Sequence, residues 1–505
     1  MKSKSIFIIL LVVLLLTSCA PAEEIIATNT VVPTSITTLP SPTPTMTVIL
    51  TVMPTPTPVL EEIHFYELKI EYLCSSQFCS IEFLNPDLIQ TITEIIYEED
   101  VKVSFDYPFI NIDRHGDEII AGNYELLTFK IGINVDDIGK TLQIQSRHGS
   151  NGGSKLSFFL NESNTLIQID EFDHLYRNPS NPDENPKIFK FSLGALRSYS
   201  PQSKNILISS SDKMVWAVYY PWIAWKQDLE CTDHPLLNYQ YNDDGSRTRE
   251  TYMEEIETAK RAGIDGFFIS WFNDPISNHN IQLILDVAEE LDFKIAIYLE
   301  SLLDGSVNPE IENWIQYAIE TFGRHPAYMQ VNNKPVIMIY GYLEAPFSRW
   351  KALFENLQMR GHNAAYFPAS YNLADLDIST GLHQYILLDK SNLVALYSTL
   401  ARSVHLSSGA NERKYFVATV SPGFNNCPYN IDNPPYEIPR ENGSFYENQF
   451  NAAINSDPDW IMITSWNEFG ESTHVQPSEN YGEYYLEITN YYLMLRTKRL
   501  QNRIR

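Results

Sequence analysis

Basic residues are scarce in this chain, which has 36 lysines and arginines against 63 aspartates and glutamates and a net charge of −27. A protein so acidic repels phosphate backbones, which excludes general nucleic-acid binding. The sequence also lacks a glycine-rich phosphate-binding fingerprint, a Cys/His zinc spacing and a calcium-loop ligand pattern. We therefore expect no cofactor and no metal. After the first twenty residues, no stretch reaches the ~18 apolar residues of a transmembrane helix.

The N-terminus resembles the export signal of a bacterial lipoprotein. Lys2 and Lys4 precede an apolar run at residues 6–16, which is too short to span a bilayer comfortably. The run ends in Leu-Thr-Ser-Cys, similar to a lipobox, in which a lipid is attached to the cysteine, here Cys19, and residues 1–18 are removed. We expect an extracytoplasmic protein held on a bacterial membrane by a lipid anchor. A plain signal peptide is the alternative.

Two further regions precede the main domain. Residues 19–59 are rich in Thr, Pro and Ser, a composition typical of an extended tether. Residues 60–205 show short stretches of alternating apolar and polar residues separated by Asn, Asp, Gly and Pro. This pattern predicts an all-β, sandwich-like domain. It contains no catalytic constellation, so an accessory or spacer role is expected, and carbohydrate binding is an alternative that no motif supports.

From residue 213 to about 500, apolar strands alternate with amphipathic helices. The expected helices include residues 249–262, 280–291, 310–322, 348–360 and 392–405. The expected strands are residues 215–220, 266–271, 294–299, 336–341, 364–369, 383–388, 416–421 and 460–465. Strands that are almost entirely apolar are buried on both faces, as in parallel sheets. Eight such units predict an α/β fold of the (β/α)8 TIM-barrel type, with a doubly wound open sheet as the alternative.

Carboxylates and aromatic residues gather at the C-terminal ends of the expected strands, where barrel enzymes place their chemistry. Glu468 and Glu471 directly follow the last strand, and Asn467 beside them can hydrogen-bond a carboxylate or a sugar hydroxyl. A Glu-x-x-Glu pair is usually a solvated helix face, and Ser465 with Glu468 also fits a helix capping box. The position after a barrel strand favours a catalytic pair instead. Glycosidic cleavage uses two such carboxyl groups, one of them protonated.

Weaker candidates lie around the same rim. Trp271 ends the second strand and could stack on a sugar ring. Asp233, His234 and Asp274 lie in loops at this end, where ordinary loop packing explains them equally well.

The cysteines other than Cys19 suggest two disulfides in an oxidising compartment. Cys74 and Cys79 bracket a four-residue loop, as if closing a hairpin. Cys231 follows the first barrel strand and Cys427 follows the seventh, so both lie in loops at the same rim and could meet.

Residues 213–495 resemble glycoside hydrolase family 99, the endo-acting α-mannosidases and α-mannanases. The resemblance rests on residues 466–472 (WNEFGES) with 475–477 (VQP), and on segments 262–271, 334–340, 421–424 and 440–446. It implies a glycosidase that retains configuration without a glycosyl-enzyme ester. Glu468 would deprotonate the 2-hydroxyl of the sugar, and Glu471 would act as acid and then base. The resemblance also places Glu300, Tyr340 and Tyr385 in contact with the sugars.

Two departures bear on the substrate more than on the fold. The family's endo-mannosidases carry His-Ile-Glu-Pro-Tyr where residues 298–302 read YLESL, and Trp-His where this chain has Phe469 and Gly470. The form WNEFGES is also partly similar to the fungal α-1,3-glucanases of family 71. The sequence therefore predicts an endo-acting hydrolase of mannan-like or related α-glycans. The alternatives are an α-1,3-glucanase-like activity, a glycan-binding or envelope-assembly protein with little hydrolytic activity, and a purely structural tethered module.

Overall fold

The computed structural model describes residues 59–74, 78–96, 101–106, 109–114, 125–148, 153–160, 165–173, 187–199, 201–208, 213–221, 231–243, 245–303, 305–388, 393–409, 412–427 and 436–504. The predicted lipid anchor at Cys19 and nearly all of the predicted tether lie outside these residues, as does the side chain of Cys74. None of the helices described is long and apolar enough to cross a membrane.

The N-terminal β region consists of two antiparallel sheets in the described residues. One sheet contains β3 (Ile89–Ile96), β6 (Glu125–Asn134), β1 (Val59–Cys74), β8 (Gly153–Leu160) and β9 (Thr165–Asp173), with β11 (Gln202–Ile208) paired to β1. The other contains β10 (Lys187–Ser192), β7 (Thr141–His148), β2 (Phe78–Phe83), β5 (Phe109–Arg114) and β4 (Val101–Asp106).

The inner faces of these two sheets are joined by aromatic contacts. Phe83 packs edge-on to Phe129, and Phe158 stacks on Phe191 with ring centroids 4.8 Å apart. In each pair, the two rings come from different sheets. Every second residue of a strand points to the same face, so these rings lie on the faces that the two sheets turn toward each other. The boundaries of this region, 60–205, stay a prediction.

The rest of the chain forms a barrel of parallel strands. In the described residues these strands are β12 (Met214–Tyr219), β13 (Gly266–Trp271), β14 (Lys294–Glu300), β18 (Lys334–Tyr340), β19 (Ala365–Pro368), β20 (Gly381–Leu382), β21 (Tyr415–Val420) and β24 (Trp460–Ile463). Pairing runs from β12 through β13, β14 and β18 to β19, and in the other direction through β24 and β21 to β20. A parallel bridge between Ala369 and His383 joins the two ends into a ring.

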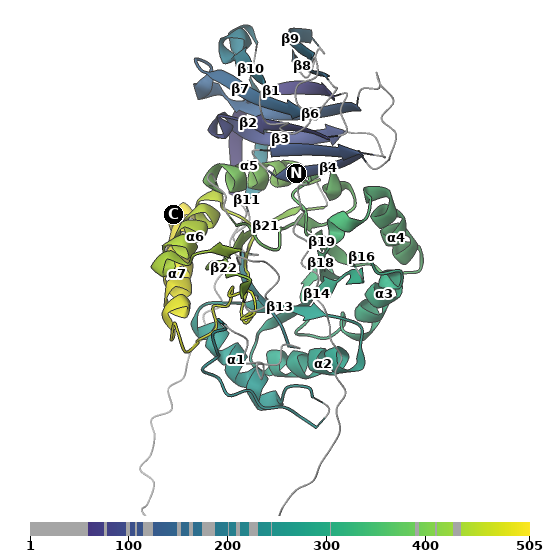
Figure 1. Cartoon of the computed structure of the whole chain (residues 1–505), viewed down its shortest axis with the longest axis vertical. Helices are drawn as coiled ribbons and strands as arrows, with labels where there is room; N and C mark the ends of the chain where they lie inside the picture. Colours follow the sequence, from purple (N-terminus) through teal and green to yellow (C-terminus); the bar gives the residue numbers. More distant parts are fainter. Residues whose placement is uncertain are drawn as a thin grey trace, which may run out of the picture. The chain divides into compact units, whose positions relative to one another are not determined.

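Helices surround these strands (Figure 1). They are α1 (Arg249–Arg261), α2 (Pro275–Glu290), α3 (Ile311–Thr321), α4 (Phe347–Met359), α5 (Leu393–Leu406), α6 (Ser444–Ser456) and α7 (Tyr484–Ile504). The short 3-10 helix η6 (Leu373–Asp377) takes the place of a helix between β19 and β20. The described elements alternate as the sequence pattern predicts for an α/β barrel.

The predicted sixth strand is displaced. We expected residues 383–388, whereas the structure pairs Gly381–Leu382 as β20, and of the expected strand only His383 is paired, through its single bridge to Ala369. Side-chain hydroxyls account for the difference, because Thr419 and Thr464 donate hydrogen bonds to the carbonyls of Gln384 and Tyr385. The carbonyls of Gln384 and Tyr385 thus bond to threonine side chains and not to the backbone of a neighbouring strand.

Large aromatic residues fill the barrel interior below the rim. The Trp216 ring stacks on Phe268 with centroids 4.3 Å apart, and Trp460 lies against Trp216 and stacks on Phe367. All four residues have no exposed surface. Gly266 makes room for this packing, since a Cβ there would lie 2.4 Å from Cζ3 of Trp216 and 2.6 Å from the Lys294 carbonyl.

We expect Gly266→Ala to lower the free energy of unfolding by about 1–3 kcal/mol, because the added methyl overpacks the barrel interior. Thermal and urea denaturation measure the loss. Gly409→Ala is the matched control, since nothing lies within 4 Å of a Cβ built there. Equal stability of the two variants would contradict the packing described here.

Candidate active site

Residues from several strands meet at the C-terminal end of the barrel. Glu300 ends β14, Tyr340 ends β18, Tyr220 follows β12, and Tyr385 lies shortly after β20. Glu468 and Glu471 come from the segment that follows β24. Because all these strands are parallel, residues far apart in the sequence arrive at one rim.

The segment that carries the glutamate pair is a compact turn and not a helix. Ser465 N donates to the Thr473 carbonyl, and Thr473 N donates to the carbonyl of Glu468. Ser465 Oγ accepts a hydrogen bond from Glu468 N at 2.8 Å, which is the serine half of a capping box, but no helix begins here. The helix-cap alternative for this pair is therefore wrong. Glu468 and Glu471 are only 3% and 6% exposed, so they are held in a largely dry environment.

Glu471 is held in a form that can keep a proton. Burial raises the pKa of its carboxyl to about 7, and the nearby Glu300 carboxylate adds to this effect. The Tyr385 hydroxyl donates to Glu471 Oε2 at 3.4 Å and opposes the shift, because it stabilises the ionised form. A carboxyl group with a pKa near 7 can both donate and accept a proton at neutral pH.

Glu300 is a second carboxyl with a raised pKa at this rim. Burial raises its pKa to about 7, and the hydrogen bond from Ser270 Oγ to Oε1, at 2.6 Å, works in the opposite direction. Ser270 and Glu300 lie on adjacent strands, and Ser270 points into the barrel from β13.

Tyr220 is a central residue that the sequence analysis did not select. Its hydroxyl lies 2.6 Å from that of Tyr385. Burial raises the pKa of Tyr220 well above its usual range, and the carboxylates of Glu468, Glu300 and Glu471 raise it further. Tyr220 is therefore close to all three acids. The two-residue repeat of β12 could have found it, because Trp216, Val218 and Tyr220 share one face of the strand.

Three more polar rings complete this end of the barrel. The rings of Tyr340 and Tyr385 are 5.6 Å apart, and the ring of Tyr298 is 6.0 Å from that of Tyr385. The Tyr298 hydroxyl lies 2.8 Å from Nε2 of His383, whose pKa burial lowers to about 3. That histidine is neutral at physiological pH. Hydroxyls and a neutral imidazole thus lie around Glu300 and Glu471 in the described residues.

Two predicted binding residues have other roles. Trp271 has no exposed surface and packs against Trp314, Tyr317 and Phe322, so its ring is not open to a sugar. Ser270 points into the barrel, so strand alternation turns its neighbour Trp271 outward, toward the helices.

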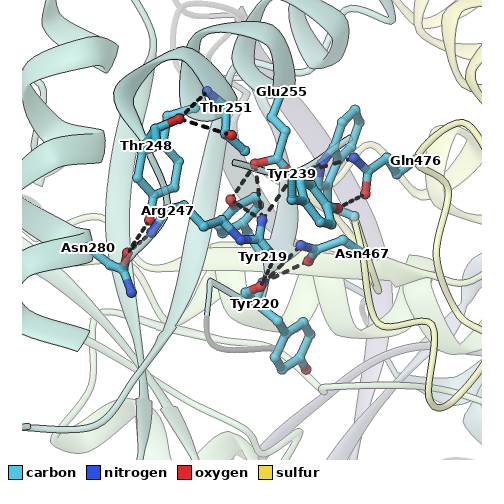
Figure 2. Close-up of polar contacts among 12 residues, drawn as sticks. Tyr219, Tyr220, Tyr239, Arg247, Thr248, Thr251, Glu255, Asn280, Asn467 and Gln476 are labelled. Carbon is cyan, nitrogen blue, oxygen red and sulfur yellow. Dashed lines mark hydrogen bonds and ion pairs between the residues drawn. The ribbon is translucent and has the colours of Figure 1, made fainter. Parts of the chain in front are cut away.

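Asn467 is also fully buried, and its amide bonds the backbone of Tyr220 at both ends (Figure 2). Asn467 Oδ1 accepts from Tyr220 N at 2.8 Å, and Nδ2 donates to the Tyr220 carbonyl at 3.1 Å. Asn467 therefore positions Tyr220 rather than offering its amide to a substrate.

The weaker loop candidates have structural partners. Asp233 Oδ2 lies 3.0 Å from His474 Nε2, and its Oδ1 accepts from Asn480 N. Asp274 caps α2 by accepting from the backbone of Ile276 and Ser277.

Cysteine pairing ties two rim loops together. Cys231 and Cys427 form a disulfide with Cα atoms 6.2 Å apart, the pairing that the positions of these residues predict. Cys79 is disulfide-bonded as well.

One family model matches most of the barrel region. The sequence profile described as "Glycosyl hydrolase family 99" matches residues 223–502, more than half of the chain. The ascus wall endo-1,3-alpha-glucanase of Schizosaccharomyces pombe is 23% identical over 265 residues, which cover 48% of this chain and 57% of that protein. The glycoprotein endo-alpha-1,2-mannosidase of Rattus norvegicus is 25% identical over 277 residues, covering 49% and 57% respectively. The chain thus spans somewhat over half the length of these curated relatives.

Among solved structures, the family 99 endo-alpha-mannosidase of Bacteroides thetaiotaomicron aligns with a TM-score of 0.48 and 23% identity. The alignment covers 56% of this chain and 97% of that one.

Glu300→Gln should raise the free energy of unfolding at pH 8 by about 1 kcal/mol or more. A glutamate whose pKa is raised by folding binds more protons when folded, so the wild type loses stability as pH rises from about 4.5 through 7. The neutral amide removes this loss. Urea denaturation at pH 4 and pH 8 tests the expectation, and the two proteins should match at pH 4. A stability difference that is the same at both pH values would contradict the raised pKa.

Proposed function

The chain belongs to glycosyl hydrolase family 99, and we propose that it hydrolyses internal α-glycosidic bonds of a mannan-like or related α-glycan. The observation that carries this proposal is that Glu468 and Glu471 lie on one buried segment at the C-terminal end of the barrel strands. Burial raises the pKa of Glu471 to about 7, which suits a group that must donate a proton at neutral pH.

The proposed chemistry uses the 2-hydroxyl of the sugar as the nucleophile. Glu468 removes the 2-hydroxyl proton while O2 attacks C1, and Glu471 protonates the departing glycosidic oxygen. The product of this step is a 1,2-anhydro sugar. Glu471, now ionised, then takes a proton from water as the water attacks C1, and O2 recovers its proton from Glu468. The two displacements at C1 together retain the configuration.

Glu471→Gln should cost most with a sugar leaving group and much less with fluoride or an activated aryl group, because good leaving groups need little protonation. Glu468→Gln should impair both substrate types alike, since O2 must lose its proton to attack C1 whichever group leaves. Comparison of kcat/KM for the two variants on both substrate types measures the difference.

A 2-O-methyl substrate is the control, because methylation removes the internal nucleophile and should abolish turnover even by the wild type. Ordinary turnover of that substrate, or a trapped ester on Glu468, would show direct carboxylate attack. Full activity of both glutamine variants would exclude the pair from catalysis.

Two classes of polysaccharide are candidate substrates. The similarity to an endo-1,3-alpha-glucanase favours α-1,3-glucan as a second candidate beside α-mannan. Incubation of the protein with α-mannans and α-glucans of defined linkage, followed by product analysis, separates them. If every α-glycan in the panel stays intact, the proposed hydrolysis is wrong, and a glycan-binding role becomes the better account.

We also propose that the protein is lipid-anchored outside the cytoplasm, on the strength of residues 16–19 and the Thr/Pro-rich segment that follows. Cys19→Ala should release the protein from membranes or block its processing, because no other residue can accept the lipid at the cleavage site. Membrane fractionation and mass spectrometry of the mature chain test this. An unchanged membrane fraction together with an unchanged mature mass would contradict the anchor.

A further inference from the structure

A buried ion pair lies just outside the barrel wall, behind the active site. Arg247 precedes α1, and its side chain forms an ion pair with that of Glu255 within α1. Neither side chain has any exposed surface. Arg247 Nη1 donates to Glu255 Oε1 and Oε2 at 3.2 and 3.1 Å and to the Tyr219 hydroxyl at 2.6 Å. The guanidinium also lies over the ring of Tyr239, 4.1 Å from its centroid.

An ion pair of this kind is a poor device for stability alone. Moving two charges out of water costs several kcal/mol each, and apolar residues of similar volume often stabilise a protein as well or better. What the pair supplies is direction, because a planar guanidinium fixes its partners in a rigid fork. The identity of those partners therefore shows what the pair holds in place.

The pair reaches the end of β12 and the catalytic segment together (Figure 2). Arg247 Nη2 donates to the Tyr220 carbonyl at 3.1 Å, the same oxygen that accepts from Asn467 Nδ2. Glu255 Oε1 accepts from Trp466 Nε1 and from Gln476 Nε2, each at 3.4 Å. Trp466 and Gln476 flank the turn that carries both glutamates.

Tyr220 connects this network to the proposed acid. Its hydroxyl is 2.6 Å from Tyr385, and Tyr385 donates to Glu471. Since the Tyr385 hydrogen goes to Glu471, the Tyr385 oxygen is free to accept from Tyr220. A continuous path of contacts thus runs from the ion pair through the backbone and ring of Tyr220 to the carboxyl of Glu471.

We propose that Arg247 and Glu255 are positioning residues, which hold Tyr220 so that the Tyr220–Tyr385–Glu471 hydrogen-bond chain is aligned for proton donation. This role rests on the proposed function, in which Glu471 is the acid. The two residues touch no reacting atom and act through Tyr220.

The direction of the pH effect follows from the groups around Glu471. Those facing it are Glu300, Glu468, Tyr220, Tyr340 and Tyr385. The groups facing the ion pair are Tyr219, Tyr239, Tyr241 and Tyr252. The Tyr385 hydrogen bond lowers the pKa of Glu471, so misalignment of the chain raises that pKa. Activity of an acid is lost as pH rises through its pKa, and the basic limb of the kcat/KM profile must therefore move to higher pH.

The test uses the full chain with three changes at the pair. Glu255→Gln leaves a buried guanidinium unpaired, and it can fail by unfolding. The double variant Arg247→Met with Glu255→Leu removes both charges at similar volume, so it should fold. We expect it to lower kcat by about 100-fold with KM within about threefold, and to move the basic limb upward by about 0.5–1 pH unit. Arg247→Lys keeps the positive charge but loses the planar fork of the guanidinium. Its stability should therefore be close to that of the wild type, while its kcat should be as low as that of the double variant.

Arg413→Met is the matched control. Arg413 pairs with buried Asp459 at the N-terminal ends of β21 and β24, the barrel end opposite the active site. This variant should lower the melting temperature while leaving kcat and the pH profile unchanged. If the double variant at Arg247 and Glu255 behaves as this control does, the pair is structural and the positioning role is wrong.

A second measurement separates this inference from the proposed function. The pKa of Glu471 is followed by carbon-13 NMR of the glutamate carboxyls, with Glu471→Gln identifying the resonance. An upward shift of the Glu471 pKa in the double variant supports the positioning role. This holds even if the wild type hydrolyses none of the α-glycans, because that second result contradicts only the proposed reaction. An unchanged pKa overturns the positioning role whether or not the wild type is active.

Discussion

In the described part of the chain, the C-terminal end of the barrel keeps the carboxyls of Glu300 and Glu471 largely out of water and gives them hydroxyls as hydrogen-bond partners. An arginine in contact with Glu471 would hold the pKa of that carboxyl well below neutrality and leave no proton to donate. In the described residues, Glu471 and Glu300 instead accept hydrogen bonds from hydroxyls, those of Tyr385 and Ser270. A hydroxyl stabilises a carboxylate less than a cation does. Burial therefore prevails, and both carboxyls have a pKa of about 7.

The alternation of side chains along each strand sorts residues between the site and the supporting shell. In β12, Tyr219 points outward to Arg247 and Glu255, whereas its neighbour Tyr220 points to the glutamates. In β13, Ser270 contacts Glu300 and Trp271 packs under α3. These two strand ends thus each place one residue at the site and the adjacent residue in the layer behind it.

Much of this arrangement was predictable because it follows from strong periodic patterns. The buried parallel strands and the rim where they end follow from local apolar runs, and the glutamate pair lies directly after the last of these strands, as the sequence predicts. The errors concern direction and partner. Trp271 and Asn467 have the right chemistry for sugars. Strand alternation, however, turns the Trp271 ring outward, and the Asn467 amide is hydrogen-bonded to the backbone of Tyr220. The two-residue repeat of β12 separates Tyr219 from Tyr220, but the pairing of Arg247 with Glu255 depends on contacts that no local pattern encodes.

The pairing between the first and last strands of the barrel is also where the site is built. First strand β12 pairs with last strand β24, and their hydrogen bonding continues past the strand ends, where Trp466 N donates to the Val218 carbonyl and Asn467 bonds both backbone groups of Tyr220. The next residue along is Glu468. The contacts that pair these two strands therefore also place Glu468, so a change that loosens this pairing must move Glu468. Because a barrel closes only when its first and last strands are in register, the same register fixes the distance between Tyr220 and the glutamate segment.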